Sequence, residues 1–288
     1  MAGLSLKALV AVAIWGTSFV FTRIALEAFT PLGLVSTRLI LGTVVLAAIQ
    51  RAIRMPPGSG RGALPTCILL GLILAVHLLI QAHGLCYTTA INTGWIVGFM
   101  PVVIALAAHR LRRQQLTPRG WIGVAVGATG VWLVTSARLA EFRSARFGDL
   151  LQLSTCLTWA AYTLLAERAT ERLGAQRVTT YAMGAATVFC LAPLVFSQPL
   201  VQSPTRSVLA AVLFLGVACS AVAFLLWSQA LRDRGPAAVG ATLYLEPLVT
   251  LCVAVPMLGE PLTSRTLLGG VGVLCGVWLV GKGTQKRG

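Results

Sequence analysis

An internal repeat constrains the fold of this chain more than any other feature of its sequence. Thirteen of the 41 residues between Gly94 and Val134 recur, without a gap, when the 288-residue sequence is shifted by 146 positions. The matched pairs include Gly94 and Gly240, Pro101 and Pro247, and Trp132 and Trp278. We therefore predict two related halves, at residues 1–140 and 141–288.

Both halves are too apolar for a soluble fold. Hydrophobic residues make up 57% of the chain and charged residues 11%, and residues 62–109 contain no Lys, Arg, Asp or Glu. A membrane-spanning helix needs about 20 apolar residues, whereas barrel strands alternate over about ten. We predict an all-α membrane protein with ten transmembrane helices, at residues 6–27, 31–50, 63–84, 90–109, 118–136, 147–166, 177–197, 207–230, 235–257 and 265–281.

Five spans in each half give the two copies opposite orientations in the bilayer. Inverted repeats of this kind are typical of secondary transporters, whose substrate site lies between the halves near the midplane. The repeat thus predicts alternating access to a small-molecule substrate.

The net charge of +15 is distributed as a membrane protein requires. With both termini in the cytoplasm, 16 of the 23 Lys and Arg residues fall in inner segments and six in outer segments, in agreement with the positive-inside rule. Anionic lipid headgroups are the expected partner of this charge, and nucleic acid is not. The seven cysteines show no CxxC pair, so no metal site, disulfide framework or cofactor is predicted.

Two prolines are predicted to break the fourth and ninth spans. Pro101 and Pro247 lie in mid-span, with Gly98 and Gly240 up to two turns before them. Proline removes a backbone hydrogen bond and kinks a helix, and freed carbonyls are tolerated only beside protein or a wet cavity. The kinks are predicted to form a cavity wall and a gating bend, although ordinary packing kinks would look the same.

Aromatic and polar side chains at helical spacing are the candidates for substrate binding. Such rings offer a large contact area and can attract an amine, although a Trp at this spacing is as often a packing residue. The candidates are Trp15, His77, Gln81, Trp95, Phe99, Trp159, Tyr162 and Tyr244.

Two charged residues are predicted inside spans, where charge is costly and usually functional. Arg38 should face the protein interior or a partner. Glu246, directly before Pro247, could carry a proton or pair with Arg38, and the sequence leaves both open. Glu260 is predicted near an outer loop, where it would cap or pair.

These motifs, in this order, resemble the drug/metabolite transporter superfamily, specifically its ten-helix exporters built from two EamA-type repeats. The resemblance covers nearly the whole chain and rests on Trp15-Gly16-Thr17-Ser18-Phe19, Pro31 with Arg38, Pro101, Gly148-Asp149-Leu150 with Trp159 and Tyr162, Glu246-Pro247, and Leu258-Gly259-Glu260-Pro261-Leu262-Thr263 with Gly269 and Gly276. One departure is Gln114, which occupies the position equivalent to Glu260, where many relatives carry an acid.

The resemblance implies a bacterial inner-membrane exporter, most similar to exporters of amino acids and aromatic compounds. Relatives that carry sugar phosphates or nucleotide sugars would need two or more cavity cations, and only Arg38 qualifies. A membrane-embedded enzyme would need a nucleophile with a base or clustered aspartates, which the sequence does not show. The glycines at 123, 127 and 130 and at 269, 272 and 276 predict close helix packing, within the chain or in a homodimer.

Overall fold

The structure is a computed structural model that describes residues 5–53, 64–112, 115–136 and 143–285. Its helical segments match the ten predicted spans in order. They are α1 (Leu6–Ala25), α2 (Pro31–Ala52), α3 (Leu64–Leu85), α4 (Ala90–Val97) with α5 (Met100–Arg112), α6 (Pro118–Ser136), α7 (Arg143–Leu173), α8 (Ala175–Leu194), α9 (Arg206–Phe214) with η2 (Leu215–Ala223) and α10 (Phe224–Arg234), α11 (Pro236–Gly240) with η3 (Ala241–Leu245) and α12 (Glu246–Leu258), and α13 (Ser264–Gly283).

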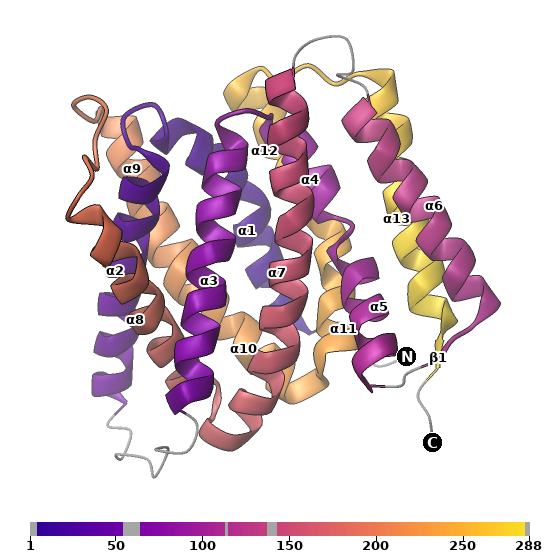
Figure 1. Cartoon of the computed structure of the whole chain (residues 1–288), viewed down its shortest axis with the longest axis horizontal. Helices are drawn as coiled ribbons and strands as arrows, with labels where there is room; N and C mark the ends of the chain where they lie inside the picture. The colour runs from indigo at the N-terminus through magenta and orange to yellow at the C-terminus, as the bar shows by residue number, and fades with distance from the viewer. Residues whose placement is uncertain (1–4, 54–63, 113–114, 137–142, 286–288) are drawn as a thin grey trace.

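The molecule is an all-α membrane protein, as predicted. Seven of the described segments are long and apolar enough to cross a bilayer, and α6, α7 and α8 add helices of 19, 31 and 20 residues. The two chain ends lie on the same, lower side of the molecule (Figure 1). On that side, the two-residue strands β1 (Gln115–Leu116) and β2 (Thr284–Gln285) pair antiparallel. The predicted boundary between the halves, at residues 140 and 141, lies outside the described residues.

Threonine caps begin three of the helices. Thr30, Thr89 and Thr205 each accept a hydrogen bond from the backbone N–H three residues further on. This satisfies one of the unpaired donors at the start of α2, α4 and α9. The caps fix where each apolar helix begins after its turn.

The repeat partners α6 and α13 pack against each other through interleaved glycines, side by side at the right of Figure 1. A Cβ added to Gly123 would lie 2.7 Å from the carbonyl oxygen of Gly276, and one added to Gly269 would lie 2.7 Å from the carbonyl oxygen of Gly130. Gly123 and Gly269 are repeat partners, as are Gly130 and Gly276, so one contact occurs twice. The contact between these two helices therefore has approximate twofold symmetry. The small-residue faces pack within the chain and let the backbones approach closely.

The fourth and ninth spans are both broken, just before Pro101 and Pro247. The fourth span breaks at Gly98–Phe99, between α4 and α5, and the ninth runs through the 3-10 segment η3 before Pro247. The two breaks meet, because a Cβ on Gly98 would lie 2.7 Å from Cγ of Pro247. The eighth span contains the π-helix η2, which the sequence did not predict.

Candidate functional site

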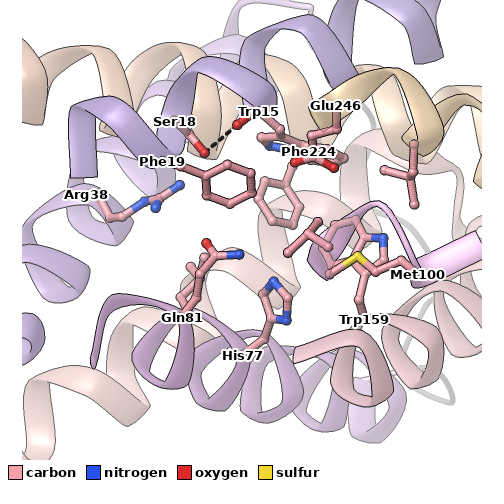
Figure 2. Close-up of a pocket in the computed structure, with 13 residues that line it drawn as sticks. Trp15, Ser18, Phe19, Arg38, His77, Gln81, Met100, Trp159, Phe224 and Glu246 are labelled. Atoms are coloured by element: carbon pink, nitrogen blue, oxygen red, sulfur yellow. Dashed lines mark hydrogen bonds between the residues drawn. The ribbon is translucent and has the colours of Figure 1, made fainter. Parts of the chain in front are cut away.

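A cavity lies at the centre of the bundle, beside the broken spans. The space between its lining side chains, open solvent included, amounts to about 380 Å³. Aromatic, aliphatic and polar side chains from both halves surround it (Figure 2). The lining residues are Trp15, Ser18, Phe19, Arg38, His77, Leu78, Gln81, Val97, Met100, Trp159, Phe224, Leu243 and Glu246.

Much of this wall consists of residues that are partners in the internal repeat. The pairs 146 positions apart are Leu78 and Phe224, Val97 and Leu243, and Met100 and Glu246. Trp15 and Trp159, which are 144 apart, form a fourth pair. Equivalent positions of the two halves thus face the same space, so the cavity lies between the two repeats.

Tryptophans form the apolar side of the cavity. The ring of Trp15 lies 5.0 Å from that of Trp159 in an edge-on arrangement, 5.1 Å from Phe224 and 5.3 Å from Trp227. Behind Trp159, the ring of Tyr162 stacks at 5.3 Å. Edge-to-face and offset-stacked contacts at these distances are favourable, and they hold the rings as a preformed surface.

Hydrogen bonds across helices fix the orientation of the lining side chains. The indole N–H of Trp15 donates to the carbonyl oxygen of Cys219, in the π-helix, at 3.1 Å. Nδ1 of His77 lies 2.8 Å from the hydroxyl of Thr158 on α7. These bonds connect α1 to η2 and α3 to α7, and they hold the two rings in place at the cavity wall.

The two charged lining residues are both buried, each 4% exposed, and do not form an ion pair with each other. Nε of Arg38 donates to Ser220 in η2 at 3.0 Å. Glu246 begins α12, and its carboxylate makes no hydrogen bond or ion pair with any described residue. Gly16 allows α1 to approach this point, because a Cβ there would lie 2.9 Å from the backbone oxygen of Glu246.

The structure brings together six of the residues that the sequence singled out: Trp15, Arg38, His77, Gln81, Trp159 and Glu246 all line the cavity. The other four aromatic candidates lie elsewhere. Trp95 packs over Gly270 of α13, and Phe99 packs over Gly127 of α6. Tyr162 is buried behind Trp159, and Tyr244 packs beside the Phe99 cluster while its neighbour Leu243 faces the cavity.

Sequence reasoning missed several aromatic and apolar cavity residues. Phe224 lines the cavity and Trp227 packs behind Trp15, and both residues lie in α10, the last part of the eighth span. The repeat itself carried a usable signal, because a shift of 146 places Leu78 on Phe224 and Gln81 on Trp227. A residue predicted at the cavity in one half therefore also identifies a position in the other.

At the upper end of the molecule in Figure 1, the turn between α3 and α4 is tied to its neighbours. Arg23 of α1 donates to the carbonyl oxygens of Leu85 and Thr88 at 2.9 and 2.8 Å. The hydroxyl of Thr88 donates to the carboxylate of Asp149 on α7. These contacts hold the α3–α4 turn against α1 and α7.

Glu260, between α12 and α13, adds a third tie to this turn. Its two carboxylate oxygens accept from the backbone N–H groups of Ala90 and Ile91, each at 2.8 Å. The prediction that Glu260 caps a helix or pairs is thereby confirmed. A carboxylate on the N-terminus of α4 is favoured by charge-assisted bonds and by the helix dipole.

The opposite end of the molecule lacks an equivalent of this cap among the described residues. Pro236, which is 146 positions from Ala90, has no N–H to donate. Gln114, the partner of Glu260, lies outside the described residues. There, Lys7 and Asp233 join α1 to α10 at 2.8 Å, with side chains 44% and 48% exposed. The two ends of the molecule are therefore held by different contacts.

An all-helical membrane bundle with a cavity between two inverted repeats has the architecture of a secondary transporter. Comparison with known families agrees. The model of the EamA-like transporter family matches residues 4–136 and again residues 146–282. The chain belongs to this family and is a membrane transporter.

Relatives match along most of their length. The chain is 32% identical to an uncharacterized transporter of Archaeoglobus fulgidus, over 92% of this chain and 93% of the relative. It is 26% identical to a probable terminal-alkyne amino-acid exporter of Streptantibioticus cattleyicolor, over 95% and 91%. It is 25% identical to the uncharacterized inner membrane transporter YedA of Escherichia coli, over 87% and 81%. A solved crystal structure shares the fold, with a TM-score of 0.72 and 18% identity over 96% of this chain and 97% of that chain.

Proposed function

We propose that this protein is an inner-membrane exporter of small organic solutes, most of all amino acids with aromatic or other large apolar side chains. The observation that carries this proposal is the position of Trp15 and Trp159, one from each repeat, on the wall of one internal cavity. Paired rings suit the apolar part of an amphipathic solute. His77 and Gln81 add hydrogen-bonding groups to the same wall.

Alternating access is the proposed mechanism. The cavity lies at the repeat interface, where a rocking of one repeat against the other would open either end. The breaks at Gly98 and before Pro247 are the proposed bends, because they join the two repeats beside the cavity. Both chain ends are proposed to lie in the cytoplasm, where the excess of Lys and Arg is expected.

The relative from Streptantibioticus cattleyicolor, named as a probable terminal-alkyne amino-acid exporter, supports amino acids as the substrate class. The cavity lining argues against phosphorylated sugars, since Arg38 is the single Arg or Lys among the described lining residues. A doubly charged phosphate bound in such a cavity would call for further cations.

Flux into liposomes tests the proposal. Purified protein in proteoliposomes should move radiolabelled L-phenylalanine across the membrane without altering it. Trp159→Ala should cut this flux at least about tenfold, since the ring is one of the two tryptophans on the cavity wall. Trp132→Ala is the matched control, because Trp132 is 61% exposed on the outside of α6. Chemical conversion of the solute, or flux unchanged by Trp159→Ala, would contradict the proposal.

A further inference from the structure

The cavity is lined by one basic and one acidic side chain that do not contact each other. The guanidinium of Arg38 enters from α2, and the carboxylate of Glu246 enters from α12 on another wall (Figure 2). No ion pair joins them within 4.0 Å. Each is buried in a bundle that sits in lipid, where an uncompensated charge is costly.

A single hydrogen bond positions the guanidinium of Arg38 and leaves its two terminal nitrogens without a partner among the described residues. Only its Nε is hydrogen-bonded, to Ser220, whose own hydroxyl donates to the carbonyl oxygen of Leu215 in the π-helix. Gly42 makes room for this contact, because a Cβ there would lie 2.8 Å from Cβ of Ser220. The two terminal nitrogens of the guanidinium remain for a planar, two-oxygen anion, the geometry of a carboxylate.

The internal repeat duplicates the apolar residues of the cavity wall but not Arg38 or Glu246. The repeat partner of Glu246 is Met100, and the position 146 residues after Arg38 is Gly184. The two halves thus supply a symmetric apolar wall, with one basic and one acidic side chain on different sides of it. A solute with separated opposite charges would fit this arrangement in one orientation.

We propose that the cavity selects zwitterionic amino acids, with the substrate carboxylate on Arg38, its ammonium on Glu246 and its side chain against Trp15 and Trp159. This inference rests on the proposed function and specifies the ionic form of its substrate. A zwitterion completes both buried charges at once. An amine or a carboxylic acid alone would leave one of them unpartnered in the occupied cavity, where water cannot replace it.

Three solutes that share one ring separate the two charges experimentally. L-phenylalanine carries both groups, phenethylamine lacks the carboxylate, and 3-phenylpropionate lacks the ammonium. Initial flux of each is measured in proteoliposomes at neutral pH. The wild-type chain should prefer L-phenylalanine at least about tenfold over either analogue, because a site built around a polar group strongly rejects analogues that lack it.

The variants should change this preference selectively. Arg38→Gln should reduce the preference over phenethylamine to less than about threefold while that over 3-phenylpropionate persists. Glu246→Gln should do the reverse. Arg51→Gln, which removes an exposed charge from the end of the same helix α2, and Glu171→Gln, at an exposed position of α7, are the matched controls and should keep both ratios.

The outcomes are distinguishable. Wild-type protein that moves none of the three solutes contradicts the proposed function itself. Wild-type protein that moves L-phenylalanine, with glutamine variants that keep both ratios or lose all three fluxes in parallel, overturns the assignment of the charges. Should a glutamine variant fail to insert, Arg38→Lys keeps the charge without the two-nitrogen fork and must keep part of the preference over phenethylamine, and Glu246→Asp must keep part of the preference over 3-phenylpropionate. Complete loss of either preference in these variants overturns the inference as well.

Discussion

Glu260 offers the sharpest test of how the start of α4 is held in place. Its carboxylate accepts two backbone hydrogen bonds, from Ala90 and Ile91 at the start of α4. Glu260→Ala removes both. Hydrogen bonds to a charged group contribute about 1.5–3 kcal/mol each, but water can replace part of this at a half-buried site. We therefore expect the tie to weaken by about 2 kcal/mol in total.

A change of about 2 kcal/mol corresponds to roughly a 30-fold change in the population of the open turn. Hydrogen–deuterium exchange read by mass spectrometry measures this directly. In Glu260→Ala, the amides of Ala90 and Ile91 should exchange roughly 30-fold faster than in the wild-type chain, while those in the middle of α7 should keep their protection.

A matched control removes an acid that has an exposed position on α7. Glu171→Ala should leave the exchange of the α4 amides unchanged. Unaltered protection of Ala90 and Ile91 in Glu260→Ala would refute the reasoning, since it would mean that the carboxylate contributes nothing to holding this turn.

Three further perturbations test the packing and the ties. Gly276→Ala should lower the free energy of unfolding by about 1–3 kcal/mol relative to Gly281→Ala on the same helix, because a Cβ on Gly276 would lie 2.7 Å from the oxygen of Gly123 whereas nothing lies within 4 Å of one on Gly281; equal melting temperatures of the two variants in detergent would disprove this. Thr88→Val should lower the free energy of unfolding by about 1–3 kcal/mol, because the buried carboxylate of Asp149 loses the hydroxyl that donates to it. A melting temperature equal to that of the wild-type chain would count against this contact. Lys7→Ala should change stability by less than about 1 kcal/mol, since its ion pair is exposed, and a larger loss would contradict this reasoning.

The sequence predicted the fold well because its two strongest signals are physical requirements. Long apolar runs must be helical in lipid, where every backbone group needs an internal partner. The 146-residue repeat adds the inverted arrangement, and the observed reciprocal contacts of Gly123 with Gly276 and of Gly130 with Gly269 satisfy it. Pro101 and Pro247 also marked both broken spans.

The rotation of each helix was harder to predict. A span that is apolar on every side has no polar face to indicate which residues turn inward. The sequence predicts that Trp95 and Phe99 lie on one helical face that turns toward the cavity. The helix breaks between them at Gly98, and Trp95 packs over Gly270 of α13 while Phe99 packs over Gly127 of α6. The π-helix η2 likewise shifts the register of the eighth span before Phe224.

The two charges were visible in the sequence but their relation was not. Arg38 and Glu246 are the charged residues of the cavity lining, and pairing between them was one of two open interpretations. The structure places them around the same space without an ion pair. Only the three-dimensional positions of α2 and α12 could decide this, because the two residues are far apart in the chain.

Accessibility of the cavity from both sides of the membrane tests the central claim most directly. Ser18→Cys places a thiol on the cavity wall in a chain whose seven native cysteines are replaced by serine. An impermeant thiol reagent should label it in right-side-out and in inside-out vesicles, and saturating L-phenylalanine should slow labelling from both sides. Labelling from one side only, whether or not solute is present, would contradict a pathway that opens alternately between the two repeats.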